Sequence, residues 1–331
     1  MVDVEKLAQV RTLITHRREG ALCPDAVAAA IVVRDVLPQI AIRFVSYGEE
    51  LALLKPTPGM LFVDIAPSPE RAVAFREVGA IVLDHHETAR EVVESFGDNG
   101  VYADRYAEPF VSGAMLAFRE VWTPLAYRKG QRPGNHYTEG RGASGVHRLA
   151  FLAGVADNHV TGSSAYEDAC EQAAALAFWP FESFPAPAFD SYGTGQALRE
   201  MLAIGKVLRR KQKAETTRLV KIGSRFTTER GTRVVVVPSR ETADAAEEIG
   251  GDADVVVGFS FGLSASGLPT MIVSTRSLTT FDCGEFCKAN GGGGHLRAAG
   301  FEFELDLEGG HPYAILADVL ECWEKHGRGA V

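Results

Sequence analysis

The sequence has few cysteines and no apolar run long enough to cross a membrane. Its five cysteines are odd in number and widely spaced over 331 residues, which argues against a disulfide framework and favours a reducing compartment. A membrane-spanning helix needs about 20 apolar residues, and no such run occurs. The first residues, 1–6, lack the basic and apolar regions of a signal peptide. We therefore expect a cytoplasmic protein with no membrane partner.

Basic residues are also in the minority. The chain has 34 Lys and Arg against 43 Asp and Glu, and its formal net charge is −9. A protein that tracks along long nucleic acids without sequence preference is normally basic, so that function is disfavoured. Short or small anionic substrates, held by local cations or by metal ions, stay compatible. No solenoid repeat or low-complexity tract is present, and the length favours two domains.

Strands and helices alternate over the first hundred residues. Strands are expected over 11–15, 42–45, 60–63 and 80–83, with helices from 24 to 36, up to 78 and from about 87. This alternation predicts right-handed crossovers and a parallel sheet, and so an α/β domain. An amphipathic helix is expected over 110–122, and a further helix over 147–159. The polar segment 122–146 is either a solvated loop or an arm that contacts a substrate or partner.

The second half of the sequence predicts a smaller α/β domain. Prolines and aromatic residues over 179–192 indicate the approach to a domain boundary, and a cationic helix over 206–218 follows. Strands are then expected over 233–237, 254–257 and 271–274, alternating with helices over 241–249, 282–289 and 312–325. We place a first domain at 1–185, a linker helix at 186–220 and a second domain at 221–331.

Three of the predicted strands end in side chains that can bind metal. The first runs into His16, the third into Asp64 and the fourth into Asp84-His85-His86. In a parallel sheet the carboxyl ends of neighbouring strands lie side by side, where ligands bind. Such a polar cluster is costly to bury unless it is hydrogen-bonded, paired or bound to metal. Taken singly, Asp64 or Asp84 could instead cap the following helix.

Two further carboxylates are candidates for the same site. Asp25 follows Pro24 in the first turn of a helix, and Asp157 lies near the end of the helix expected over 147–159. Mixed nitrogen and oxygen ligands suit Mn²⁺, Zn²⁺ or Fe²⁺, whereas oxygen alone suits Mg²⁺ better. A carboxylate can bridge two ions roughly 3.5–4 Å apart, a spacing used for attack on phosphorus.

A glycine run in the second half is a candidate anion site. Residues 290–300 read Asn-Gly-Gly-Gly-Gly-His-Leu-Arg-Ala-Ala-Gly. Gly292 and Gly293 leave the backbone able to turn N–H groups toward an anion, and we expect the following turn to present a helix N-terminus. His295 and Arg297 add side-chain donors. A glycine run alone is more often a flexible loop. Arg276, at a strand end, is either a phosphate clamp or a surface cation.

Together, the Asp84-His85-His86 triplet and the glycine-rich motif with its His and Ala-Ala-Gly resemble the DHH phosphoesterase family. The resemblance implies an N-terminal DHH-type α/β domain with a parallel sheet, a helical linker, a smaller DHH-associated domain, and an active site in the interdomain cleft. It implies two divalent ions, with Mn²⁺ favoured and Mg²⁺ as the alternative. The implied ligands are His16, Asp25, Asp64, His85 and Asp157, with Asp64 bridging.

The same resemblance assigns the other candidates. His86 would contact the scissile phosphate and Asp84 would orient a neighbouring histidine. The remaining phosphate or the base of the substrate would be bound by Arg276, Gly292, Gly293, His295 and Arg297. The chain departs from the family pattern at one position. Members usually carry two aspartates separated by one residue after the first histidine, and here Cys23 occupies the first of these positions. Either Cys23 is a soft ligand, or Glu19 supplies the missing carboxylate, or one ion is weakly held.

The implied function is a metal-dependent phosphoesterase that hydrolyses short single-stranded oligonucleotides, as nanoRNases do, or small nucleotides. Two alternatives in the same class are a 3′-phosphoadenosine-5′-phosphate phosphatase and a cyclic or linear dinucleotide phosphodiesterase. A nucleotide-binding protein with a degraded metal site is an alternative from another class, motivated by Cys23. Whether the chain forms a homodimer is left open.

Overall fold

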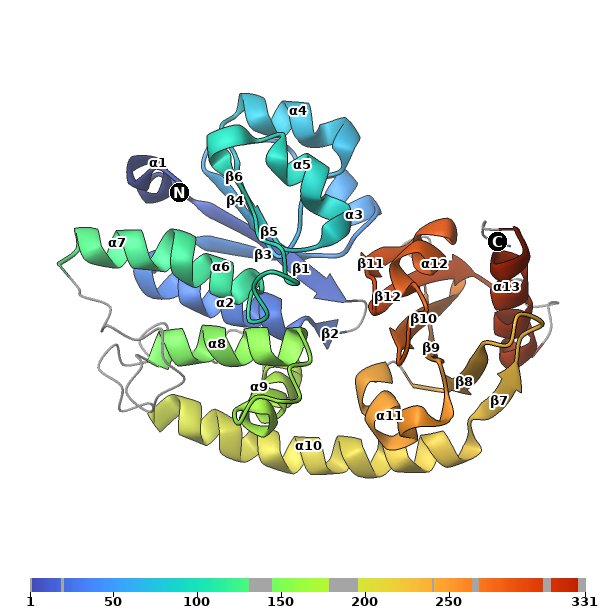
Figure 1. Cartoon of the computed structure of the whole chain (residues 1–331). Coiled ribbons are helices and arrows are strands. Elements are labelled where there is room, and N and C mark those ends of the chain that lie inside the picture. Colours follow the sequence, from blue (N-terminus) through green and yellow to red (C-terminus); the bar gives the residue numbers. More distant parts are fainter. Residues whose placement is uncertain are drawn as a thin grey trace. The chain divides into compact units, whose positions relative to one another are not determined.

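The computed structural model describes residues 2–18, 21–130, 145–178, 196–239, 241–263, 268–305 and 311–326. The chain forms two compact units, Met1–Arg209 and Arg210–Val331, which we call the N-terminal and C-terminal units (Figure 1). The division falls within the helix α10 (Gln196–Ile222), which contains the predicted cationic helix. The predicted boundary segment 179–192 lies outside the described residues. None of the described helices is long and apolar enough to cross a membrane.

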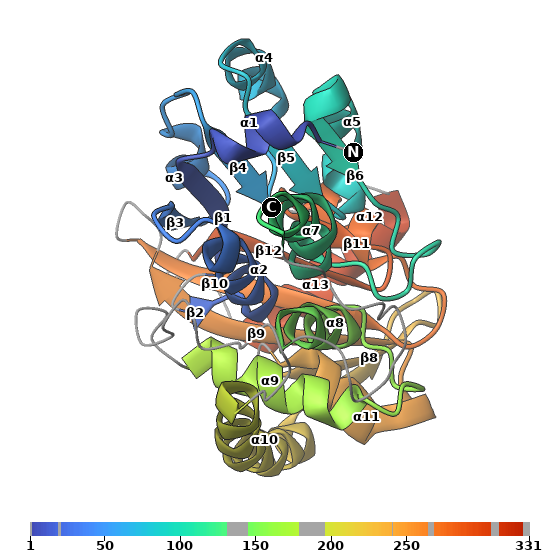
Figure 2. The same cartoon turned by 90° about the vertical axis from the view of Figure 1, so that its left-hand side faces the viewer.

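A parallel sheet organises the N-terminal unit. Its strands are β1 (Thr12–Arg18), β3 (Ala41–Val45), β4 (Met60–Val63), β5 (Ile81–Asp84) and β6 (Gly100–Tyr102). They lie in the order β3-β1-β4-β5-β6 with parallel pairing throughout, as Figure 2 shows. The short strand β2 (Ala21–Leu22) pairs antiparallel with the end of β1. All residues of β4 and β5 are buried, as expected for central strands covered on both faces. The predicted parallel α/β domain is confirmed.

Helices cover both faces of this sheet (Figure 1). On one face lie α2 (Pro24–Val36), α6 (Gly113–Ala117) and α8 (Gly145–Asp157), and on the other α3 (Glu49–Ala52), α4 (Pro69–Glu77) and α5 (Arg90–Glu94). Leu61 and Leu83 point into the first core, whereas Phe62 and Val82 point into the second. This alternation follows from the period of two along a strand.

Further helices extend the first face. They are α1 (Val4–Ala8), a π-helical turn (Phe118–Trp122), α7 (Thr123–Arg128) and α9 (Tyr166–Phe178). The helix predicted over 110–122 begins at Gly113, because the Ser112 side chain caps it by accepting a hydrogen bond from the Met115 amide. Helix α7 lies within the predicted polar segment 122–146, so part of that segment is helical. Residues 131–144 lie outside the described ranges.

The C-terminal unit is built on a mixed sheet. Its strands are β7 (Ser224–Thr227), β8 (Arg233–Val237), β9 (Val255–Leu263), β10 (Pro269–Ser277), β11 (Gly293–His295) and β12 (Ala298–Glu304). They lie in the order β11-β12-β10-β9-β8-β7. The β8–β9 pair is parallel, and the other pairs of described strands are antiparallel. The predicted α/β character is confirmed, although β7 and the β11–β12 hairpin were not predicted.

The faces of the second sheet are also covered. α12 (Cys283–Ala289) and α13 (Pro312–His326) pack on one face with Val236 and Val257. α11 (Thr242–Ile249) packs on the other with Val235 and Val256. The all-valine runs of β8 and β9 thus supply both cores, which explains why they lack an alternation of polar and apolar residues.

Candidate metal centre

The register of the N-terminal sheet aligns three of the predicted site residues. Thr15 pairs with Val63, which in turn pairs with Leu83. The next residue along each strand direction is His16, Asp64 or Asp84, so these three leave the sheet at one level. The carboxyl edge of the sheet therefore brings together side chains that are far apart in the sequence, as expected for a parallel sheet.

Asp64 is at the centre of this group. Its Oδ1 lies 3.2 Å from Nε2 of His85 and 4.0 Å from Nδ1 of His86. Its Oδ2 lies 3.7 Å from Sγ of Cys23 and 3.8 Å from Nδ1 of His16. Asp64 is buried and has a φ of 63°, an uncommon conformation for a residue other than glycine. Such strained positions often occur at functional sites.

Asp84 organises the two histidines that follow it. Its Oδ1 accepts hydrogen bonds from the amides of His85 (2.7 Å) and His86 (3.0 Å). The same oxygen lies 2.6 Å from Nδ1 of His86, which donates to it. Burial alone would lower the pKa of His86, but the Asp84 carboxylate outweighs burial and raises that pKa to about 10. Asp84 therefore fixes the backbone of both histidines, orients the ring of His86 and favours a positive charge on it.

Asp25 is held by the start of α6. Its Oδ2 accepts a hydrogen bond from the Gly113 amide (2.6 Å), and its Oδ1 accepts one from the Ala114 amide (3.1 Å). Burial, together with the negative charges of Asp64 and Asp157, raises the pKa of Asp25 to about 8. The position of Asp25 beside the strand ends agrees with the sequence analysis.

Gly113 is a residue that the sequence analysis missed. A Cβ at this position would lie 2.5 Å from Cβ of Asp64 and 3.0 Å from Oδ2 of Asp25. Glycine is therefore the residue that allows the start of α6 to approach both carboxylates. The only sequence signal is a Ser-Gly pair before an apolar run, which is typical of any helix start and names no site.

The last member of the group comes from α8, whereas Cys23 and Asp25 come from the start of α2. Asp157, the final residue of α8, places its Oδ2 at 3.8 Å from Nε2 of His85. We call the eight side chains gathered here the carboxyl-edge cluster: His16, Cys23, Asp25, Asp64, Asp84, His85, His86 and Asp157.

The chemistry of this cluster fits divalent metal ions. Three carboxylates, those of Asp25, Asp64 and Asp157, share a small volume and repel each other when ionised. Burial alone would raise the pKa of Asp64, but His16 and His85 outweigh burial and hold it well below its usual range. Oδ2 of Asp157 and Nδ1 of His16 are buried and have no hydrogen-bond partner among the described residues. A cation would satisfy these atoms and relieve the repulsion.

The predicted substrate residues lie together in the C-terminal unit. Arg276 in β10 and His295 in β11 both have Ala298 of β12 as their register partner. The carbonyl oxygen of Arg297 accepts a hydrogen bond from the Ser277 amide at 2.9 Å. Residues 293–304 thus form a hairpin, and the expectation that the glycine run would be followed by a helix N-terminus is wrong.

The glycines of that hairpin have a packing role. The Gly292 amide donates to the Cys287 carbonyl at 2.8 Å, so it is already used within the unit. A Cβ on Gly292 would lie 2.1 Å from the carbonyl oxygen of Gly300, and one on Gly294 would lie 2.6 Å from Cα of Ala299. Gly293 pairs with Gly300 in the β11–β12 ladder. Close strand approach therefore explains Gly292 and Gly294, and phosphate binding there stays a prediction.

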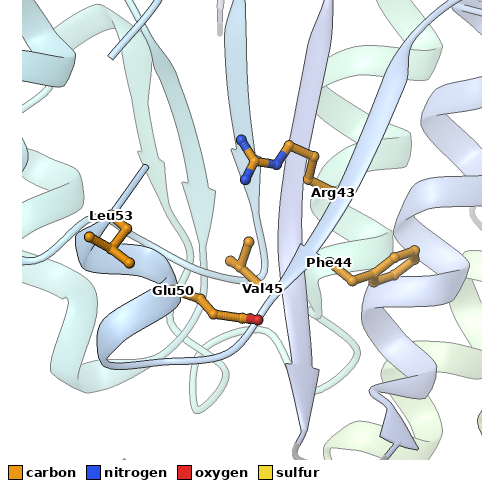
Figure 3. A pocket seen from close by; sticks show the side chains of 5 residues that line it. All are labelled: Arg43, Phe44, Val45, Glu50 and Leu53. Carbon is orange, nitrogen blue, oxygen red and sulfur yellow. The ribbon is translucent and has the colours of Figure 1, made fainter. Parts of the chain in front are cut away.

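A groove in the N-terminal unit is lined by none of the residues of the carboxyl-edge cluster. It has a volume of about 210 Å³ and is lined by Arg43, Phe44, Val45, Glu50 and Leu53 of β3 and the α3 segment (Figure 3). Its one carboxylate, Glu50, is hydrogen-bonded by Nε of Arg17 at 3.2 Å. The groove therefore lacks the set of metal ligands found at the carboxyl edge.

The fold was compared with known proteins. No family model and no curated protein matches the sequence. Among solved structures, the chain is similar to a DHH-domain protein described as a member of a family of ribosomal proteins. The identity is 13%, the TM-score is 0.56, and 96% of this chain and 87% of that chain are covered.

Two other solved structures give lower scores. An exopolyphosphatase-related protein from Bacteroides fragilis has 11% identity and a TM-score of 0.42 over 97% of this chain and 94% of that one. RecJ from Thermus thermophilus, solved in complex with Mn²⁺, has 16% identity and a TM-score of 0.46 over 91% of this chain and 50% of that one. The similarity to the DHH-domain protein shows that this chain has the fold of that protein.

Proposed function

We propose that the protein is a metal-dependent phosphoesterase that hydrolyses short single-stranded oligonucleotides or small nucleotides. The observation that carries the proposal is the convergence of His16 of β1 and His85, which follows β5, on Asp64, with Asp157 of α8 beside His85. The same fold in a DHH-domain protein supports it. Clusters of buried groups with perturbed pKa values are typical of catalytic sites.

The cluster offers ligands for a pair of divalent ions. We propose that His16, Asp25, Asp64, His85 and Asp157 hold them, with Mn²⁺ favoured over Mg²⁺ because two ligands are imidazoles. When bound, such ions would supply a water nucleophile activated at neutral pH and would neutralise the phosphoryl oxygens. Asp64 has both carboxylate oxygens directed at different ligands of the cluster, as a bridging carboxylate requires.

The chain's own residues would bind and orient the phosphate. Because Nδ1–H of His86 donates to Asp84, the ring is fixed, and the Asp84 carboxylate favours a proton on the second ring nitrogen as well. That N–H can donate a hydrogen bond to a phosphoryl oxygen or to the leaving oxygen. We propose that Arg276, His295 and Arg297 bind the second phosphate or the base of the substrate.

A product analysis tests this function. The purified protein would be incubated with Mn²⁺ and di- to pentanucleotides of RNA or DNA, linear and cyclic dinucleotides, and adenosine carrying 3′- and 5′-phosphates. We expect release of nucleoside monophosphates from the short oligonucleotides. Release of inorganic phosphate from the bisphosphorylated adenosine alone would instead identify a 3′-phosphatase. Absence of metal-dependent hydrolysis across the panel, with tight nucleotide binding, would identify a binding protein.

Variants connect that activity to the cluster. Asp64→Asn and His85→Ala should each lower the rate by more than about 100-fold, since even the outer-shell partners of metal ligands typically contribute 10–100-fold. Asp98→Asn is the matched control, because Asp98 is exposed in a turn of the same unit. Circular dichroism would check that each variant is folded. Full activity in Asp64→Asn would contradict the proposal.

A further inference from the structure

We propose that Cys23 is itself a metal ligand, so that His16, Cys23 and Asp64 form a soft site distinct from the imidazole and carboxylate site at His85. This inference rests on the metal binding in the proposed function, and it does not depend on which phosphoester is the substrate. It predicts two sites that prefer different metal ions. The sequence alone left a weakly held ion as one alternative.

The distances between the three ligand atoms carry the inference. Sγ of Cys23 and Nδ1 of His16 lie 3.7 and 3.8 Å from the same oxygen, Oδ2 of Asp64. The three residues each offer a ligand atom within 4.8 Å of those of the other two. Bond lengths of about 2.3 Å to sulfur and about 2.0–2.2 Å to nitrogen and oxygen give tetrahedral edges of about 3.6 Å for S–O and about 3.4 Å for N–O. The observed separations differ from these edges by only a few tenths of an ångström.

An octahedral ion fits these separations less well. At right angles, the same bond lengths place neighbouring ligand atoms about 3.1 Å apart for S–O and about 3.0 Å apart for N–O. The atoms around Oδ2 of Asp64 would have to move closer by about 0.6 and 0.8 Å to reach those spacings. Asp64 has little freedom to move, because it is buried and because α6 passes so close that Gly113 has no room for a Cβ. The geometry therefore favours a tetrahedral ion.

The position of Cys23 in the fold directs its sulfur toward Asp64. Cys23 is 4% exposed and occupies the N-cap of α2, a helix of 13 residues with Pro24 at its start. Its side chain makes no capping hydrogen bond to the helix, so Sγ is directed elsewhere, toward Asp64.

A thiolate changes which ion the site prefers. Sulfur ligands select Zn²⁺, Fe²⁺ or Co²⁺ over Mn²⁺ and Mg²⁺. We expect the His16, Cys23 and Asp64 site to retain Zn²⁺ or Co²⁺, while the site at His85 and Asp157 accepts Mn²⁺. Replacing Cys23 by aspartate, the residue usual in the family, should make the two sites more alike.

Titration with Co²⁺ tests the sulfur–metal bond directly. A thiolate bound to Co²⁺ gives a charge-transfer band in the near ultraviolet, and tetrahedral Co²⁺ absorbs strongly in the visible. We expect both signals in the metal-free protein after one equivalent of Co²⁺, and in the control Cys322→Ser, which alters a cysteine of the other unit. Cys23→Ser should lose the charge-transfer band, and Cys23→Asp should also lose it while lowering the preference for Zn²⁺ over Mn²⁺ by about 10–100-fold.

The outcomes separate this inference from the proposed function. A band that persists in both folded Cys23 variants, or a wild-type protein that binds Co²⁺ without the band, overturns the inference even if hydrolysis occurs. A band that depends on Cys23 in a protein that hydrolyses no phosphoester supports the inference and contradicts the proposed function. Failure of the wild type to bind Co²⁺ overturns the inference. If Cys23→Ser does not fold, Cys23→Asp decides the result.

Discussion

Replacing Gly113 by alanine should damage both the stability of the N-terminal unit and its metal binding. Gly113 is the first residue of α6, and its backbone is not in the left-handed region. Alanine would therefore favour the helix by up to about 1 kcal/mol if space allowed it. Space does not allow it, because the added Cβ would lie 2.5 Å from Cβ of Asp64 and 3.0 Å from Oδ2 of Asp25.

The magnitude follows from what has to move. Overpacking a buried position costs about 1–3 kcal/mol. Moving α6 away also weakens the hydrogen bonds that the Gly113 and Ala114 amides donate to Asp25, each worth about 0.5–1.5 kcal/mol, because the raised pKa of Asp25 keeps its carboxyl mostly neutral at pH 7. Allowing for relaxation and for the helix preference of alanine, we expect a net loss of about 2–4 kcal/mol. At about 2–4 °C per kcal/mol for a unit of this size, the Tm should fall by about 5–15 °C.

Thermal unfolding followed by circular dichroism, with and without Mn²⁺, measures this effect. Gly162→Ala is the matched control in the same unit, because a Cβ at Gly162 meets no atom within 4 Å. We expect Gly113→Ala to lose stability and most of the stabilisation by Mn²⁺, and the control to keep both. A Gly113→Ala protein with wild-type Tm and wild-type response to Mn²⁺ would refute the packing argument around Asp64.

Three further predictions follow from other parts of the chain. Asp84→Ala should lower the free energy of unfolding by about 2–4 kcal/mol, because two amides and an imidazole lose their shared acceptor. Urea unfolding measures this, with Asp98→Ala as the control. Equal stability of the two variants would contradict the prediction. The hydrogen bond from Arg17 lowers the pKa of Glu50 from 4.5 to about 2, so the ionised form stabilises the fold. That stabilisation is complete above about pH 4.5 and lost as the pH falls toward 2, and because Glu50 is partly exposed it should not exceed about 1 kcal/mol. Urea titrations of Glu50→Gln and wild type should therefore differ at pH 7 and converge in acid; a difference that grows in acid would contradict the sign. Burial raises the pKa of Cys283 to about 11 and that of Cys287 to about 12. A thiol reagent at pH 8 should therefore label these two cysteines only after the protein unfolds. Rapid labelling of the native protein, detected by mass spectrometry, would contradict their burial.

The sequence was most informative where local and global signals agree. Each of β1, β4 and β5 is a short apolar run followed by a polar group, and parallel pairing places His16, Asp64 and Asp84 at one edge. The presence of these strands and the gathering of their polar residues at one edge can both be predicted without knowing the exact residue at which each strand begins or ends. The start of α2 was also predictable, because Pro24 at the first helical position fixes Asp25 in the first turn.

Other features depend on contacts that the sequence does not encode locally. Gly113 is needed because two carboxylates lie next to it in space, and nothing in its neighbourhood in sequence signals them. The β11–β12 hairpin is rich in glycine, so it has the composition of a loop, yet Gly292 and Gly294 serve close strand packing. The antiparallel pairings of β9 and β10 likewise depend on chain topology, which apolar runs leave open.

The convergence of the cluster on metal ions is the central claim, and anomalous diffraction from crystals soaked in Mn²⁺ measures it most directly. We predict anomalous density at the carboxyl edge of the N-terminal sheet, within bonding distance of Asp64 and of His85 or Asp157. Bound Mn²⁺ located only at other acidic groups, or no density at saturating Mn²⁺, would contradict the account.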